Sequence, residues 1–338
     1  MFILSKKNFV YIMVGIFLMS CSNNNSNSQD KIDPTPKPEP PMFLSSIGAI
    51  QYNVKKYAKD DKRDTWGNET FRKEQVSSIE KVIQGSDPVD FIAFEMGDSP
   101  KLSDELKKRG LHNWESLVNP SSNKQKERSE NQITYNTDRW ELIENGSNIN
   151  GNNKIKGFRN GYWMGEFNNG EWDFRSISSN HDTVHRNIRI YYLGYFLFKG
   201  DKKTKVLFVA SHFPHYQEFG PNKWNWQQFH TFVRELVGNE TNLGDVHMIF
   251  AGDMNMSKAD FHDNVNIPHY LKDFGSFHLS NDLETCCNNK DHTFVNPFDH
   301  VATNKGEINK AFILPKTGTF NAQGEEHKAI YVEIKLNN

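Results

Sequence analysis

Five short apolar runs recur along the chain, and each of them carries a polar or charged residue at or next to one of its ends. They span residues 48–53, 91–95, 206–212, 247–255 and 298–302. Runs of four to six apolar residues bounded by polar or glycine positions predict buried strands. A strand end is a rigid place from which a side chain can be presented to a cleft. The five ends carry Asn, Glu, His, Asp-x-Asn and Asp, so we expect one site assembled across a sheet.

Two segments between these runs have the spacing of apolar residues that is typical of amphipathic helices. One covers residues 72–83 and is ended by Gly85, and the other covers residues 227–237. Each would connect two of the predicted strands. Helices mixed with strands, without a strict βαβ repeat, indicate stacked sheets with helices outside.

The remaining strand-rich segments predict hairpins. Residues 133–143 are interpreted as a hairpin with a turn in the middle, and residues 162–174 as a hairpin around Asn169-Gly170, the strongest two-residue turn signal. Residues 188–198 are expected to pair with residues 206–210 across a polar loop.

The first 41 residues differ from the rest of the chain. Lys6 and Lys7 precede an apolar stretch at residues 9–19, which is too short for a stable membrane span and is typical of a signal peptide. The following cysteine, Cys21, resembles that of a bacterial lipobox, which predicts lipidation and export to the cell envelope. The alternative is ordinary secretory cleavage. Residues 21–41 are rich in Asn, Ser and Pro and predict a tether, which leaves residues 42–338 as one domain.

The net charge and the cysteine content bear on the possible ligands and on disulfide bonding. The formal net charge is −2, and loss of Lys6 and Lys7 with the leader would change it to −4. No strongly basic face for gripping nucleic acid is visible in this balance, which argues against tight non-specific binding but not against nuclease action. Cys286 and Cys287 are adjacent and would close a very small ring, so we expect two partly buried thiols rather than a disulfide.

The order and chemistry of the strand-end residues resemble the endonuclease/exonuclease/phosphatase superfamily, the DNase I-like proteins. The resemblance covers roughly residues 47–336. It rests on six positions with good strand contexts, namely Glu95, Ser211-His212, the Gly252-Asp253-Met254-Asn255 signature, Asp299 and His327, with Asn53 as an early strand-end Asn. Asp98 repeats a Glu-x-x-Asp spacing often seen there. One departure is Glu326, where the family usually has Asp before the terminal His.

The resemblance implies a fold and a division of labour. The fold is an α+β, four-layer, DNase I-like two-sheet β-sandwich flanked by helices. Mg²⁺, or alternatively Mn²⁺, would be bound by Glu95, Asn53 and Glu326. The further roles are water activation by Asp253, phosphate binding by Asn255 and Arg189, a hydrogen bond from His212 to a non-bridging oxygen, an Asp299–His327 pair, and support of His212 by Glu130. Taken singly, each of these residues has an ordinary structural explanation, and His181, His215 and His300 are expected to be structural.

The function that follows is a Mg²⁺-dependent phosphoester hydrolase of the cell envelope, a nuclease-like phosphodiesterase acting by metal-assisted attack of water. The alternatives within the enzyme class are a phospholipid or sphingomyelin phosphodiesterase and a sugar-phosphate phosphatase. A non-catalytic surface-binding lipoprotein on the same fold is the alternative from another class. Nucleic acid is the expected substrate, the membrane is reached through the lipid anchor, and a monomer without a protein partner is expected.

Overall fold

The fold described below belongs to the unit Pro41–Asn338, which is compact in the computed structural model. The structure describes residues 43–54, 66, 68–95, 100–118, 132–143, 156–159, 162–168, 171–173, 191–212, 230, 233–234, 236–238, 241–263, 271–288, 293–318 and 327–336. Within these residues, no helix has both the length and the apolar character needed to cross a membrane.

The first sheet has six strands and contains both ends of the described chain. Its order is β16 (Glu307–Ile313), β17 (Ile330–Lys335), β1 (Ser46–Asn53), β2 (Phe91–Glu95), β4 (Gln132–Asn136) and β3 (Trp114–Val118). β1 and β2 are parallel and in register, with Asn53 opposite Glu95. Two of the predicted polar strand ends therefore lie side by side.

The second sheet carries the other predicted strand ends. Its main path is β12 (His278–Leu279), β15 (Asp299–Thr303), β11 (His247–Asp253), β10 (Lys205–His212), β9 (Tyr191–Phe198), β7 (Tyr162–Asn168) and β6 (Lys156–Arg159). β5 (Trp140–Leu142) pairs with β9, and β8 (Glu171–Asp173) pairs with β7. β10 and β11 are parallel with His212 opposite Asp253, and antiparallel β15 places Asp299 opposite Asp253.

The two sheets pack face to face through a shared apolar core. Strands alternate their side chains between two faces, so Phe91 of β2 and Phe208 of β10 both point between the sheets, where their rings stack with centroids 4.8 Å apart. Ile249 and Val301 of the second sheet and Val332 of the first are fully buried in the same cluster. Burial of each such side chain is worth roughly 1.5–3 kcal/mol, and this packing holds the polar strand ends of both sheets at one edge.

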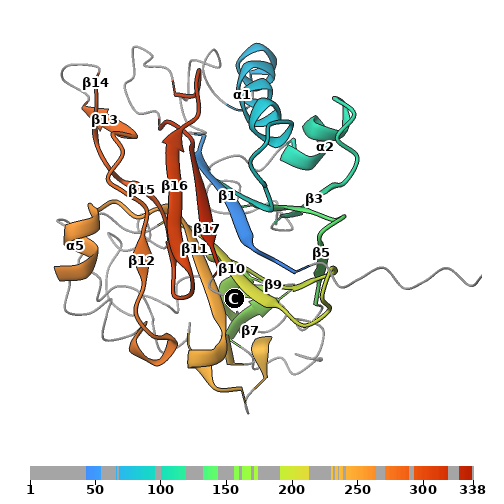
Figure 1. Cartoon of the computed structure of the whole chain (residues 1–338), viewed down its shortest axis with the longest axis vertical. Helices are drawn as coiled ribbons and strands as arrows, with labels where there is room; N and C mark the ends of the chain where they lie inside the picture. Colours follow the sequence, from blue (N-terminus) through green and yellow to red (C-terminus); the bar gives the residue numbers. More distant parts are fainter. Residues whose placement is uncertain are drawn as a thin grey trace, which may run out of the picture. The chain divides into compact units, whose positions relative to one another are not determined.

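Helical elements cover the outer faces of the sandwich. α1 (Glu69–Ile83) begins at Asn68, whose side chain accepts a hydrogen bond from Phe71 N, and it buries Val76 and Ile79 against the first sheet. α2 (Leu102–Lys107) lies beside α1 in Figure 1. The second sheet buries its outer face with α5 (Lys258–Asp263), η5 (Leu243–Asp245) and η6 (Lys272–Phe274). The predicted two-sheet sandwich flanked by helices is confirmed.

Most of the individual predicted elements are present in the structure. The five strands and the pairing of β9 with β10 are confirmed. The helix predicted at 72–83 begins three residues earlier, at Glu69, and the hairpin predicted at 162–174 is formed by β7 and β8. The hairpin at 133–143 is wrong, because β4 and β5 belong to different sheets. Of the helix at 227–237, the structure describes only His230, Val233, Arg234, Leu236 and Val237, all helical.

The reason for the wrong hairpin is a buried carboxylate between the two sheets. Asp90, just before β2, accepts hydrogen bonds from Gly48 N at 2.9 Å and from Trp140 Nε1 at 2.7 Å, and Arg139 Nε lies 3.1 Å from it. The hydrogen bond to Asp90 holds Trp140 between the sheets, and β5, which begins at Trp140, pairs with β9 instead of with β4. Burial raises the pKa of Asp90, and the Arg139 guanidinium opposes that shift.

Candidate active site

The polar ends of β1, β2, β10 and β11 meet at one edge of the sandwich. Asn53 and Glu95 come from the first sheet, and His212 and Asp253 come from the second. The close pairing of β10 with β11 requires glycine at position 252, because a Cβ there would lie 1.8 Å from the carbonyl oxygen of Ser211. The glycine of the Gly-Asp-x-Asn signature thus lets Asp253 sit directly beside His212.

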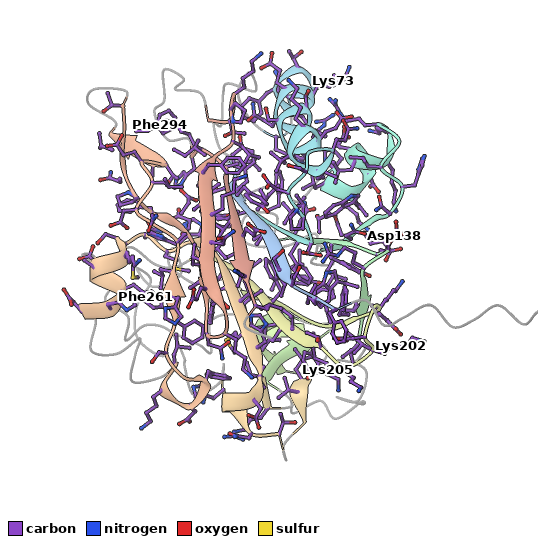
Figure 2. All side chains as sticks on the ribbon, in the orientation of Figure 1. Lys73, Asp138, Lys202, Lys205, Phe261 and Phe294 are labelled. Atoms are coloured by element: carbon purple, nitrogen blue, oxygen red, sulfur yellow. The ribbon has the colours of Figure 1, made fainter. Side chains whose placement is uncertain are left out.

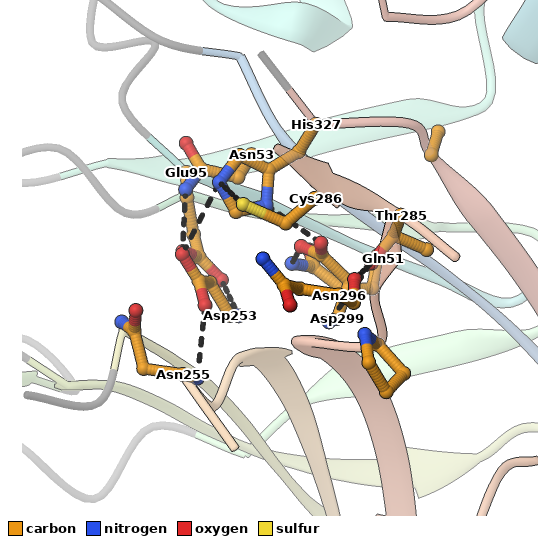
Figure 3. A network of polar contacts seen from close by, with 12 residues as sticks. Gln51, Asn53, Glu95, Asp253, Asn255, Thr285, Cys286, Asn296, Asp299 and His327 are labelled. Atoms are coloured by element: carbon orange, nitrogen blue, oxygen red, sulfur yellow. Dashed lines mark hydrogen bonds and ion pairs between the residues drawn. The ribbon is translucent and has the colours of Figure 1, made fainter. Parts of the chain in front are cut away.

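Asp253 is the centre of this group and is almost completely buried. Its backbone N–H donates to Glu95 Oε1 at 2.8 Å, and its Oδ2 accepts from Asn53 Nδ2 at 3.1 Å. Its Oδ1 accepts from the backbone N–H of Asn255 at 2.9 Å, as Figure 3 shows. Asn255 has φ of 50°, a left-handed conformation that asparagine tolerates better than most residues and that often marks functional sites. Both carboxylate oxygens of Asp253 are therefore held in fixed directions.

His212 lies between the two carboxylates. Its Nδ1 is 3.6 Å from Glu95 Oε2, and its Nε2 is 3.3 Å from Asp253 Oδ2. One ligand-type atom from each of Glu95, His212 and Asp253 lies within 4.8 Å of the other two, a spacing that could hold a metal ion. The structure thus places His212, expected at a phosphate oxygen, within reach of the same ion as Glu95.

His327 and Asp299 form a pair on the other side of Asp253. His327 Nδ1 donates to Asp299 Oδ2 at 2.6 Å, and the other oxygen of Asp299 accepts from Gln51 Nε2 at 2.7 Å. His327 Nε2 is 3.6 Å from Asp253 Oδ2, and both histidine and aspartate are buried. A carboxylate on Nδ1 fixes the orientation of the ring, so Nε2 is directed toward Asp253 (Figure 3).

The donor set fits a hard divalent cation. Asn53 Oδ1 is buried and has no hydrogen-bond partner among the residues that the structure describes. Such an orphaned oxygen is costly unless a cation or water satisfies it. With Glu95 and Asp253 it makes an oxygen-rich cluster, which suits Mg²⁺ or Mn²⁺, and the imidazole of His212 is compatible with Mn²⁺. The predicted ligands Glu95 and Asn53 thus lie together, whereas Glu326 falls outside the described residues.

Solved structures with the same fold identify the architecture. An endonuclease/exonuclease/phosphatase family protein from Bacteroides thetaiotaomicron superposes with a TM-score of 0.54 at 18% identity, over 88% of this chain and 100% of that chain. The chain has the endonuclease/exonuclease/phosphatase fold. A mannosyl-6-phosphatase from Bacteroides thetaiotaomicron gives a TM-score of 0.52 at 17% identity, over 85% of this chain and 98% of that chain. TDP2 from D. rerio, complexed with a single-strand DNA product, gives 0.50 at 12% identity, over 86% of this chain and 99% of that chain.

Sequence comparison adds no closer relative. No protein-family model matches the chain, and no curated protein matches it. The likeness to solved structures therefore establishes the endonuclease/exonuclease/phosphatase fold and nothing finer.

The structure brings together most, but not all, of the residues predicted from sequence. Those it gathers at one edge are Asn53, Glu95, His212, Asp253, Asn255, Asp299 and His327. Those that lie outside the described residues are Cys21, Asp98, Arg189 and Glu130, as well as His181 and His215. His300 Nε2 lies 2.6 Å from Pro297 O, and burial lowers the pKa of this histidine.

Three side chains that touch the site were missed by the sequence reasoning. Gln51 holds Asp299, and Thr285 Oγ1 accepts from the backbone N–H of Asp299 at 3.2 Å. Gln51 could have been found, because it precedes Asn53 by two residues and so shares its face of β1. Thr285 gave no signal, since only the tertiary fold brings it to β15.

Cys286 is the third missed residue and corrects an expectation. It is buried and disulfide-bonded, and its Sγ lies 3.2 Å from His327 Nε2. The expectation of a free thiol is therefore wrong for Cys286. Cys286 is the first residue of β13 (Cys286–Asn288), which pairs with β14 (Thr293–Asn296) with a register shift between Cys286 and Cys287.

A large cavity elsewhere in the endonuclease/exonuclease/phosphatase fold is not this site. It has a volume of about 1010 Å³ and is lined by Lys205 and His247 at the starts of β10 and β11, with Lys305 nearby. The site lies at the ends of the same two strands. Figure 2 labels Lys205, which lines the cavity, at the lower right.

Proposed function

We propose that this protein is a metal-dependent phosphoester hydrolase. The observation that carries the proposal is the position of the Asp253 carboxylate, which lies 3.3 Å from His212 Nε2 and 3.6 Å from His327 Nε2 and accepts a hydrogen bond from Asn53. A purely binding protein has no need for a buried carboxylate flanked by two imidazoles and a second carboxylate. The comparison structures support the class of reaction, because their names include a phosphatase.

Each residue of the site has a separate role in the proposed phosphoester hydrolysis. Asp253 orients the attacking water and accepts its proton, since both of its oxygens are fixed by Asn53 and Asn255. His327, held by Asp299, donates a hydrogen bond from Nε2 to a phosphoryl oxygen as negative charge develops there. Glu95 and Asn53 would hold a divalent cation, which would supply charge neutralisation on the phosphoryl oxygens. Water adds to phosphorus, the bond to the leaving oxygen breaks, and that oxygen takes up a proton.

The substrate proposed first is the phosphodiester of a nucleic acid outside the cell. Support comes from the TDP2 structure, which contains a single-strand DNA product, and from the leader, which is expected to export the protein to the cell envelope. A sugar phosphate is the second candidate, because a mannosyl-6-phosphatase superposes over 85% of this chain. The two candidates differ in chemistry, since one is a diester and the other a monoester.

An activity panel tests the proposal. The full chain is assayed with single-strand DNA, RNA, mannose 6-phosphate, sphingomyelin and bis(p-nitrophenyl) phosphate, each with Mg²⁺, with Mn²⁺ and with EDTA. Cation-dependent cleavage of DNA or RNA supports the first candidate, release of phosphate from mannose 6-phosphate alone selects the second, and cleavage of sphingomyelin alone overturns both. The matched control is Asp138→Asn, a change at an exposed turn carboxylate, against Asp253→Asn in the site. Hydrolysis that Asp253→Asn leaves unchanged would move the chemistry elsewhere.

A further inference from the structure

A small hairpin lies against the histidine of the site and belongs to neither large sheet. It consists of β13 and β14 and pairs with no other strand that the structure describes. The residue before it, Thr285, accepts a hydrogen bond through its carbonyl oxygen from the backbone N–H of Lys328 at 2.9 Å. Lys328 Nζ also lies 4.1 Å from the ring centre of Phe294. The hairpin is thus attached to the residue that follows His327.

This attachment brings a sulfur atom to the reacting face of the imidazole. Cys286 Sγ is 3.2 Å from His327 Nε2, and both residues are buried, with 2% and 8% of their surfaces exposed. Nε2 is the nitrogen that does not contact Asp299 and that faces Asp253. The sulfur is therefore placed at the nitrogen that the proposed reaction uses (Figure 3).

The oxidation state of Cys286 decides what this sulfur can do. Cys286 is disulfide-bonded, so its sulfur carries no hydrogen and can only accept. His327 Nε2 must then carry the hydrogen of this contact, and because sulfur is a weak acceptor, a phosphoryl oxygen in the site can take over that hydrogen bond. A thiol in the same place has an S–H that can donate to Nε2, which stabilises the ring form whose Nε2 accepts. That form cannot donate a hydrogen bond to a phosphoryl oxygen.

We propose that Cys286 is a positioning residue for His327 and that its disulfide, formed with Cys287, is the active state of a thiol switch. The inference rests on the proposed function. Reduction by a dithiol transfers two electrons and two protons to the cysteine pair, which becomes two thiols, while the dithiol closes into its own cyclic disulfide. The Cys286 thiol then occupies Nε2, and hydrolysis slows.

Cys287 is taken as the partner by elimination. The chain has three cysteines, and the third, Cys21, is expected to carry lipid. Peptide mapping of the oxidised full chain tests the assignment. A Cys286–Cys287 link is expected, and a Cys21–Cys286 link overturns it.

The kinetic experiment compares the oxidised and reduced full chain in detergent with bis(p-nitrophenyl) phosphate and saturating Mg²⁺. We expect kcat to fall by about tenfold on reduction with dithiothreitol and to recover on reoxidation. This loss is smaller than the 10²–10⁴-fold rate enhancement that general acid–base catalysis typically contributes. Cys287→Ser leaves Cys286 as a permanent thiol and should show the lower kcat in both buffers. Cys21→Ala is the matched control, because it removes a cysteine but keeps the pair, and it should respond to reduction as the wild type does.

Two further measurements distinguish failure of the thiol switch from failure of the proposed hydrolase activity. In His327→Ala the residual kcat should be the same in both redox states, and a remaining difference would place the effect elsewhere. Nitrogen-15 NMR of the His327 ring reports the state of Nε2 without any substrate, and its resonance should move on reduction. An unmoved resonance or an equal kcat in the two states of an active enzyme overturns the switch. A resonance that moves in a protein inactive on every substrate of the panel overturns the proposed function instead.

Discussion

Asn53 and Asp253 are 200 positions apart in the chain and are joined by a hydrogen bond of 3.1 Å from Nδ2 to Oδ2. This bond connects β1 of the first sheet to β11 of the second. It also leaves Asn53 Oδ1 pointing elsewhere, without a hydrogen-bond partner among the described residues. One amide group thus orients the proposed base with its nitrogen and offers a cation its oxygen.

Replacing this amide should therefore damage activity more than stability. In Asn53→Ala, Asp253 loses a donor to a charged group, worth about 1.5–3 kcal/mol, so kcat should fall by roughly ten- to a hundredfold. The melting temperature should change by only a few degrees. Steady-state kinetics and a thermal melt of the same preparation check this, and full activity in the variant would contradict the role of the bond.

Asp253 and His327 should act as one unit. Asp253→Asn and His327→Ala each remove a group that acts on the reacting phosphate, so each should lower kcat by about 10²–10⁴-fold with the fold intact. The double variant should lose less than the product of the two, because groups that work in one step are not additive. Circular dichroism checks the fold. Losses that multiply would show that the two residues serve separate steps.

Binding of the cation by Glu95 should be detectable without substrate, as a change in thermal stability. Glu95→Gln keeps an acceptor for the backbone N–H of Asp253 but removes the charge. Mg²⁺ should raise the melting temperature of the wild type by several degrees, since a ligand at 100 times its Kd stabilises by about 2.7 kcal/mol, and should raise that of Glu95→Gln much less. Asp138→Asn is the control and should shift like the wild type. Equal shifts in all three proteins would exclude Glu95 as a ligand.

Stability should fall with acid because of a buried histidine. Burial lowers the pKa of His247 from 6.5 to about 3. The unfolded chain therefore binds a proton that the folded chain does not between these values, and stability decreases as the pH drops from about 6.5 toward 3, by ~1 kcal/mol per pH unit. His247→Gln should lose less stability than the wild type between pH 7.5 and 5.5. Urea unfolding at both pH values measures this, and equal losses would show that His247 does not contribute.

The leader gives the fifth prediction. Cys21→Ala should release a catalytically competent protein, because residues 21–41 are predicted to be a tether that adds nothing to the core. The wild type should stay with the membrane fraction and partition into detergent. Membrane fractionation with an activity assay tests both statements. Wild type found in the medium with residue 22 or a later one at its N-terminus would show simple secretion.

Sequence predicted the strands and their polar ends because that information is local. The run that ends at Glu95 and the one that ends at Asp253 each carry their own pattern, and the structure has them as β2 and β11. The partner of β5 could not be predicted, since it depends on Trp140 reaching Asp90, fifty positions away. Cys286 belongs to the same category, because nothing in its neighbourhood in the sequence indicates a contact with His327.

The site is divided between two sheets, and this has a consequence for biosynthesis. Asn53 and Glu95 stand on one sheet and His212 and Asp253 on the other, so neither sheet alone assembles a reactive centre. His327, just before β17, is synthesised after the strands that carry the other four residues. A chain that has emerged only as far as β15 lacks this imidazole and the strand that closes the first sheet between β16 and β1. We therefore expect the proposed hydrolysis to begin only after both sheets have formed and packed together.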